Sequence, residues 1–469
     1  MTTIQQVLIH VENIPCFSNS STDDYWIGVL GKNNSGSKTY GSGLGVDSSG
    51  NVYGVGFTRD QTGGHLNPYT WEAYVYKIDV DGDLQWQRIL GESGRQNSNY
   101  DQLEFYDAAV DSSGNVYGCG RVYENNPGYP NDGPAKYLIG KWNSNGTLQW
   151  QRRIEGNGGM NTGEASYTQA CGCDSSDNLY VIGRVWVSKT CIFVCKYNSS
   201  GSLQWQRVLS GGTGAAAAYG GYVDSSGNTY ITGFSDYHTS GGRNDAILVK
   251  YNSSGTLQWQ KLFAHSDGST SVSIHNCATD PDGNIFTASN RLGIAKWNSS
   301  GTLQWQKTLG GRGGWCIACD ECGNAYMADF QENIISGSSG NDIVISKWDT
   351  DGNLEWQRAF GANSSQSDQS DFITWGNIFI NDAHSICVTA TTEAVYSDQN
   401  ALTFKLPNDG SLTGTHGNFV YQACNLTVAT PSHSASNASL SSATSGASSS
   451  TSSYPESSKN NSYNKDVIN

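Results

Sequence analysis

Three regularly spaced cysteines, Cys316, Cys319 and Cys322, are the pattern in this sequence that most resembles a metal site. Thiolates at such spacing bind zinc, but zinc also needs a fourth ligand and a sharply turning loop. The internal copies described below align Cys319, Cys171 and Cys277 with small apolar residues of buried strands, where free cysteine is common. We therefore predict that all twelve cysteines are reduced and that no metal or other cofactor is bound. The aligned residues are Val46, Val110, Cys173 and Val223 for Cys319, and Leu44, Ala108 and Gly221 for Cys171 and Cys277.

Two acidic stretches resemble calcium-binding loops. They are Asp79-Val-Asp-Gly-Asp83 and Asp349-Thr-Asp-Gly-Asn353. Both lack the glutamate that closes an EF-hand loop, and both occupy a position that other copies of the repeat fill with Asn-Ser-Ser-Gly. We interpret them as tight turns, in which an aspartate bonds to its own backbone and glycine supplies a positive φ.

Motifs for catalysis are missing from the sequence. It contains no G-x-S-x-G, no H-E-x-x-H and no phosphate-binding P-loop. The sialidase pattern S-x-D-x-G-x-x-W does not fit the register of the recurring Val-Asp-Ser-Ser-Gly-Asn-Val-Tyr. We predict that the protein is not an enzyme and has no catalytic residues, although a glycan-cleaving site on its loops stays open because a fold alone does not fix function.

The strands that would position any site come from segments that recur along the sequence. A unit such as Lys250-Tyr-Asn-Ser-Ser-Gly-Thr-Leu-Gln-Trp-Gln-Lys261 occurs seven times, always with leucine seven residues after the lysine. Successive lysines are separated by 46 residues (Lys250 to Lys296) up to 64 residues (Lys77 to Lys141). A unit of fixed length with variable connections predicts a β-hairpin around a tight turn. Six copies carry a tryptophan, which we expect to wedge against the next repeat: Trp86, Trp150, Trp205, Trp259, Trp305 and Trp356.

A second recurring piece, Val46-Asp-Ser-Ser-Gly-Asn-Val-Tyr53, places a turn aspartate between two further strands. Each repeat therefore contains four antiparallel strands, which is the content of one propeller blade. We predict an all-β fold, a seven-bladed β-propeller. The turn aspartates are Asp47, Asp111, Asp174, Asp224, Asp280, Asp320 and Asp382.

The N-terminal stretch Tyr25-Trp-Ile-Gly-Val-Leu-Gly31 resembles the outer strand of a repeat without the rest of its blade. The seventh hairpin, which begins at Lys405, has lost its tryptophan. We therefore expect the N-terminal strand to complete the seventh blade and close the ring. The predicted domains are an N-terminal arm (1–24), the propeller (25–424) and a Ser-rich C-terminal tail (425–469).

A basic residue follows each hairpin tryptophan by two positions, from Arg88 to Arg358. Charged outer strands discourage edge-to-edge aggregation, so we interpret these residues as solvated edge protection, with a partner-binding stripe as the alternative. After residue 431 the tail has few large apolar side chains, and we expect it to be disordered unless partners order it.

Both kinds of recurring turn are short and fall on one face of the ring, whereas the long, varied connections fall on the other, the loop face. Function concentrates on such loops. Aromatic residues there indicate a protein or glycan contact. The candidate binding residues are Tyr69, Trp71, Tyr123, Tyr129, Tyr237 and His238.

The net charge of −15 argues against nucleic acid as a partner, because phosphate binding needs clustered basic residues. No apolar run is long enough to insert into a membrane. The start, Met-Thr-Thr-Ile-Gln-Gln-Val, lacks the features of a secretory signal, so we expect synthesis in a cytoplasm.

The paired motifs DSSGNVYxxG and KxNSSGxLQWQRxLG resemble the repeats of seven-bladed propellers common among bacterial surface proteins. The Gln-Trp-Gln version is similar to structural proteins of marine phages, especially those that infect cyanobacteria. This resemblance covers roughly residues 25–421 and rests on structural motifs. It implies a virion component in a tail, fibre or capsid-surface position, and it transfers no catalytic residues.

We therefore expect a non-enzymatic phage virion protein, made in the host cytoplasm and acting in assembly or host contact. Its expected partners are other virion proteins, bound through the arm and the tail, and a host surface glycan or protein. The alternative is a carbohydrate-binding or carbohydrate-cleaving propeller that acts at a cell surface.

Overall fold

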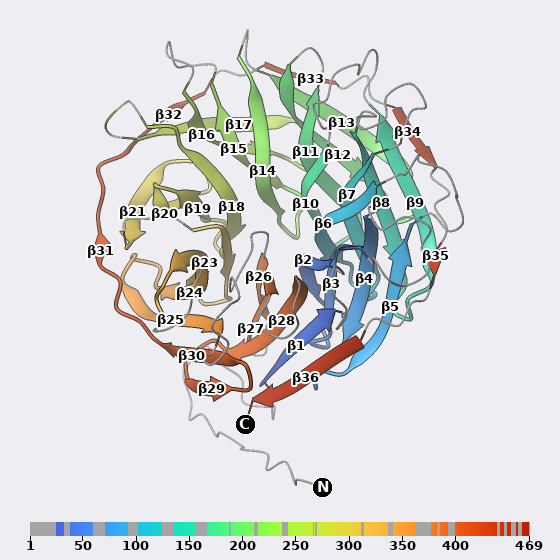
Figure 1. Ribbon diagram of the computed structural model, residues 1–469. Coiled ribbons are helices and arrows are strands. Elements are labelled where there is room, and N and C mark those ends of the chain that lie inside the picture. The colour runs from blue at the N-terminus through green and yellow to red at the C-terminus, as the bar shows by residue number, and fades with distance from the viewer. Residues whose placement is uncertain are drawn as a thin grey trace, which may run out of the picture.

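The fold was determined from a computed structural model. It describes residues 25–31, 38–59, 71–91, 102–123, 135–155, 167–186, 189–210, 214–236, 243–265, 267, 270–310, 314–335, 341–362, 377–381, 385–392, 399–438, 441–444, 448–451, 456–457 and 462–468. Seven antiparallel sheets are arranged around a central axis, which confirms the predicted seven-bladed propeller (Figure 1). Among the described residues there is no helix that could span a membrane.

Each blade contributes four strands, ordered from the central axis outwards. Blade 1 consists of β2 (Lys38–Val46), β3 (Val52–Arg59), β4 (Glu72–Ile78) and β5 (Leu84–Leu90). Blade 2 consists of β6 (Gln102–Val110), β7 (Val116–Tyr123), β8 (Ala135–Trp142) and β9 (Leu148–Glu155). Blade 3 consists of β10 (Tyr167–Cys173), β11 (Leu179–Trp186), β12 (Thr190–Tyr197) and β13 (Leu203–Ser210). Blades 4 and 5 are β14 (Ala216–Val223), β15 (Thr229–Ser235), β16 (Asp245–Tyr251) and β17 (Leu257–Ala264), and β18 (Ser273–Thr279), β19 (Ile285–Asn290), β20 (Gly293–Trp297) and β21 (Leu303–Leu309). Blades 6 and 7 are β22 (Cys316–Cys319), β23 (Ala325–Glu332), β24 (Asn341–Trp348) and β25 (Leu354–Ala362), and β26 (Asn377–Asn381), β27 (Ser385–Thr392), β28 (Asn400–Pro407) and β1 (Tyr25–Gly31).

The turn aspartates of blades 1 to 6 fix the inner half of these blades, whereas Asp382 lies outside the described residues. In blade 2, Asp111 Oδ1 accepts hydrogen bonds from the backbone amides of Ser113 (3.1 Å) and Asn115 (2.9 Å). Its other oxygen accepts a hydrogen bond from the hydroxyl of Tyr117 (3.0 Å) and lies 3.0 Å from Nζ of Lys141. One carboxylate therefore holds the turn, the second strand and the lysine of the third strand.

The calcium-like stretches are turns, as predicted. The backbone amide of Asp83 donates to Asp79 Oδ1 (2.8 Å), and that of Asn353 donates to Asp349 Oδ1 (2.8 Å). These two carboxylates accept hydrogen bonds from their own turns, which is the role that the sequence pattern indicated.

The outer hairpins interlock neighbouring blades. Trp86 on β5 donates its indole N–H to the carbonyl of Ser144 in the turn of blade 2 (3.0 Å). Its ring lies against Gly146, where a Cβ would come within 2.7 Å of the indole and where φ is +76°, so that glycine is required for two reasons. The prediction that these tryptophans wedge against the next blade is confirmed. Equivalent indole-to-carbonyl bonds join Trp150 to Ser199, Trp205 to Ser253, Trp259 to Ser299 and Trp305 to Thr350, and Trp356 packs against Gly410.

The arginines that follow these tryptophans are part of the same lock. Arg88 Nε donates to the carbonyl of Gly146 (2.8 Å), and its guanidinium lies over the Trp86 ring. Solvated edge protection is therefore the wrong interpretation of these arginines, because a fixed carbonyl of the next blade satisfies the guanidinium. The same bond joins Arg152 to Gly201, Arg207 to Gly255 and Arg358 to Gly410.

The N-terminal strand closes the ring as predicted. β1 pairs antiparallel with β28, and Trp26 stands opposite Lys405, the register that every other hairpin tryptophan has with its lysine. Trp26 is fully buried and donates its indole N–H to the carbonyl of Val80 in blade 1 (3.3 Å). Its ring packs on Gly82 as Trp86 packs on Gly146. The missing seventh tryptophan is thus supplied by the opposite end of the chain.

The C-terminal tail forms a belt outside the propeller (Figure 1). After the hairpin of β29 (Gly414–His416) and β30 (Phe419–Ala423) on blade 6, the chain runs backwards and adds one strand to each remaining blade. Its last strand pairs with β1, on the edge opposite β28. The added strands are β31 (Val428–Ala429) on blade 5, β32 (Ser434–Asn437) on blade 4, β33 (Ser441–Thr444) on blade 3, β34 (Ser448–Thr451) on blade 2, β35 (Glu456–Ser457) on blade 1 and β36 (Ser462–Ile468) on blade 7.

The expectation that the tail is disordered without partners is therefore wrong for its described residues. The tail cannot form a core, but it does not need one, because each outer strand offers a row of unpaired backbone groups. Short serine-rich segments satisfy those groups by main-chain pairing, which places little demand on side chains. Composition predicted the lack of a core correctly and missed the edges that the same chain provides.

The first prediction tests closure. Replacing Trp26 with alanine should lower the free energy of unfolding by about 3–5 kcal/mol, because it removes a fully buried indole at the joint of the ring. Chemical denaturation and calorimetry give the measurement. Trp315→Ala is the matched control, since Trp315 is 40% exposed and should change stability little. Equal midpoints for Trp26→Ala and the wild type would contradict the closure.

A second prediction concerns the belt. Removing residues 427–469 should deprotect backbone amides in the outer strands of blades 1 to 5 and promote aggregation through the exposed edges. Hydrogen exchange, read strand by strand, measures this, and the inner strands of the same molecule serve as the control. Unchanged exchange in β5, β9, β13 and β17 would show that the belt does not cover them.

Candidate functional site

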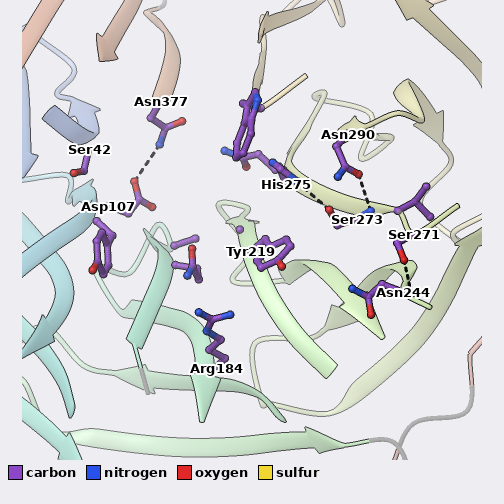
Figure 2. Close-up of a pocket in the computed structure, with 17 residues that line it drawn as sticks. Ser42, Asp107, Arg184, Tyr219, Asn244, Ser271, Ser273, His275, Asn290 and Asn377 are labelled. Carbon is purple, nitrogen blue, oxygen red and sulfur yellow. Dashed lines mark hydrogen bonds between the residues drawn. The ribbon is translucent and has the colours of Figure 1, made fainter. Parts of the chain in front are cut away.

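A cavity of about 520 Å³ lies at the centre of the ring, towards the loop face (Figure 2). The inner strands enter the propeller at this face, so residues in their first halves surround the mouth. Contributions also come from Arg184, near the end of β11, and from Asn290, at the end of β19. The cavity therefore belongs to several blades at once and exists only in the closed ring.

Seven equivalent residues form the rim of this cavity, one from each blade. Each stands five positions before its turn aspartate in the sequence. In blades 1 to 5 the residue lies at a β-bulge, where the register of the inner strand shifts by one. A bulge leaves a residue unpaired and re-aims its side chain, which here contributes to the cavity lining. We call this set the mouth ring: Ser42, Tyr106, Gln169, Tyr219, His275, Trp315 and Asn377.

The mouth ring departs from the repetition that governs the rest of the blade. The turn aspartate occurs in all seven copies, whereas six different residue types occupy the mouth ring. All of them can stack or form hydrogen bonds, and none is aliphatic. Sequence reasoning missed this set because it searched the variable loops. Aligning the copies on the aspartate and counting back five residues would have found it.

One half of the rim is aromatic. The His275 ring lies between those of Tyr219 (centroids 5.5 Å apart) and Trp315 (4.1 Å), both in edge-on geometry. Phe234 and Phe330 support the two ends of this row, at 5.2 Å from Tyr219 and 6.4 Å from Trp315. Trp315 nevertheless keeps 40% of its surface exposed.

His275 is neutral in this setting. Burial lowers the pKa of its imidazole to about 4, and Nε2 lies 3.0 Å from the hydroxyl of Ser273. The backbone amide of Ser273 in turn donates to Asn290 Oδ1 (2.8 Å). The imidazole is therefore held in place as an uncharged aromatic ring.

The other half of the rim is polar and centres on Asp107. The backbone amide of Cys171 in blade 3 donates to its Oδ2 (2.9 Å), and Asn377 Nδ2 in blade 7 donates to its Oδ1 (3.0 Å; Figure 2). Blade 1 has a glycine, Gly43, where it approaches the Asp107 backbone, because a Cβ there would lie 2.4 Å from that backbone. Burial raises the pKa of Asp107 to about 7. A single carboxyl group thus links three blades around the mouth.

Two of the loop residues selected from the sequence are described, and both lie away from the cavity. Trp71 packs against Tyr40 and Phe57 (centroids 5.4 and 5.2 Å away), with the Arg59 guanidinium 4.9 Å from its ring. Tyr123 contacts the guanidinium of Arg121. Neither residue lines the cavity. The remaining candidates lie outside the described residues: Tyr69, Tyr129, Tyr237 and His238.

The described cysteines offer little chemistry. Cys277 is buried as predicted, whereas Cys171 and Cys319, which were expected in buried positions, are half-buried. Cys316 is also buried, and Cys322 is half-buried. Burial raises the pKa of the Cys316 thiol to about 12, which keeps it protonated and unreactive. In the described part of the chain, no group of three or more His, Cys, Asp or Glu residues is arranged to hold a metal ion.

No protein-family model matches this chain, and comparison with curated proteins gives no match. Solved propellers are similar to it. The Dos1 propeller shares 11% identity over 78% of this chain and 79% of its own, with a TM-score of 0.43. The C-terminal WD40 domain of Sif2 shares 12% over 81% and 97%, with a TM-score of 0.40. A protein of unknown function from Bacteroides caccae shares 13% over 71% and 93%, with a TM-score of 0.36.

The third prediction follows from Asp107. An aspartate of ordinary pKa, 3.8, loses its proton in the unfolded chain well below pH 7, whereas folded Asp107 keeps its proton until about pH 7. Between these values the folded state binds more protons, so stability falls as pH rises and then levels off above pH 7. Wild type should lose on the order of a few kcal/mol more than Asp107→Asn between pH 4 and pH 8.

Denaturation midpoints across this range test the prediction. Asp282→Asn, at an exposed turn position, serves as the control and should keep the wild-type slope. Parallel curves for wild type and Asp107→Asn would show that Asp107 is already ionised at acidic pH.

Proposed function

We propose that this protein is a non-enzymatic structural component of a phage virion, a propeller that serves in assembly or host contact. The observation that carries the proposal is the double closure of the ring. β1 lies between β28 and β36, so the first and the last described strands are both built into the seventh blade. Opening the ring requires release of the belt and of the buried Trp26 together. A particle outside the cell is not repaired, so its components depend on slow unfolding of this kind.

The cavity supports a role in binding. Among the described residues that line it, Asp107 carries the one carboxyl group. Hydrolysis of a glycosidic bond ordinarily uses a pair of carboxyl groups on opposite sides of the bond. Both oxygens of Asp107 already accept hydrogen bonds from the protein. The mouth therefore has the features of a recognition site. This observation also favours the binding half of the second candidate function, a carbohydrate-binding propeller at a cell surface.

In this proposal the chain is made in the host cytoplasm and joins the virion there. It docks on other virion proteins through the arm (1–24) and through the belt, whose strands each end a sheet and so keep one edge for pairing. The loop face then points outwards, towards a host glycan or protein. The net charge of −15 agrees with a partner other than nucleic acid.

The fourth prediction is that purified particles of the phage encoding this sequence contain the chain in a fixed ratio to the other structural proteins. Quantitative mass spectrometry of particles banded on a density gradient measures that ratio, with a non-virion phage protein as the control. Particles of normal composition that lack the chain would contradict the proposal.

A further inference from the structure

The mouth ring has a division of chemistry that the repeat does not require. Three of its four aromatic residues, Tyr219, His275 and Trp315, are contiguous, from blades 4 to 6. Asp107 and Asn377 stand on the other side of the cavity, where Tyr106 of blade 2 is the remaining aromatic residue (Figure 2). A ligand that fills this space meets aromatic rings on one side and amide or carboxyl groups on the other. Cavities of this volume are typical of small-molecule sites.

We propose that the central cavity binds a neutral saccharide and does not cleave it. A sugar ring has an apolar face of C–H groups and a rim of hydroxyl groups. The exposed ring of Trp315 would pack against this apolar face, together with the ring of Tyr219, which lies beside His275. Asn377, Gln169 and Arg184 line the part of the cavity that would meet the hydroxyl rim, where amide and guanidinium groups donate hydrogen bonds.

Other ligand classes fit this lining less well. A phosphorylated ligand needs several cations, and within the described part of the chain Arg184 is the single lysine or arginine that lines the cavity. An extended peptide would pair with the axis-facing edges of the inner strands. Bulges at Ser42, Tyr106, Gln169, Tyr219 and His275 interrupt five of those edges at the depth of the cavity.

The protonation states around the mouth agree with a neutral ligand. His275 is uncharged at physiological pH, and Asp107 titrates close to it. Among the described residues that line the cavity, Asp107 and Arg184 are therefore the groups that carry charge near neutral pH, and a ligand gains mainly through hydrogen bonds and ring contacts. This inference does not depend on where the protein resides, so it stands or falls separately from the virion proposal.

The test uses the full chain on an array of defined neutral, acidic and sulfated oligosaccharides. The best binder is then measured by titration calorimetry and by saturation-transfer NMR. Trp315→Ala should weaken binding roughly tenfold or more, because a partly exposed aromatic platform is lost. Gln169→Ala, a half-buried polar residue of the rim, should weaken it as well. Phe379→Ala is the matched control, because Phe379 is 38% exposed on β26 and does not line the cavity.

The proposal is supported if a neutral oligosaccharide binds and chromatography recovers it intact. Binding must also be weaker in Trp315→Ala and Gln169→Ala and unchanged in Phe379→Ala. Failure of every array member to bind overturns it, as does a preference for charged glycans or equal binding by all variants. Cleavage of the bound oligosaccharide overturns the non-catalytic part. If the protein binds a saccharide but is absent from phage particles, only the virion proposal is contradicted. If the protein is present in particles but binds no saccharide, only the saccharide proposal is contradicted.

Discussion

The contact between a tryptophan of one blade and a turn of the next is the interaction on which this propeller depends. A sheet of four strands cannot bury both faces alone, so each blade is stable only against its neighbours. In blades 1 to 3 the indole N–H and the following guanidinium both bind carbonyls of a turn whose glycine leaves room for the ring. Because Trp26 makes the seventh such contact from the far end of the chain, no blade is left as a terminal blade.

Much of this architecture was predictable because it is repeated. Seven lysine-to-leucine hairpins and seven turn aspartates determine the number of blades, and the isolated Tyr25–Gly31 strand has no other place to pair. The belt was not predictable by the same reasoning, because pairing through backbone atoms leaves no signature in side chains. From its composition a serine-rich segment is predicted to be disordered, unless the outer strand edges with which it can pair are also considered.

The candidate site escaped prediction for a related reason. A search for function in variable loops assumes that the scaffold is uniform and that specificity is added outside it. Here the variable residues sit within the scaffold, at one position of the inner strand, and bulges contribute them to the cavity lining. Ser42 and Trp315 occupy the same place in two blades that otherwise follow one pattern. The repeated residues form the inner strands around the cavity, and the position that varies between repeats gives each blade its own residue in the mouth ring.

The direction of the belt fixes the order in which the molecule can be finished. Translation proceeds from blade 1 towards blade 7, yet the belt then runs back from blade 6 to blade 1 before it reaches β36. The first described strand, β1, must therefore wait for both of its partners, β28 and β36, until blades 1 to 6 and the belt have been synthesised. A nascent chain that still lacks the belt cannot complete the seventh sheet. Such long-range pairing folds slowly, and the same pairing must be undone before the chain unravels.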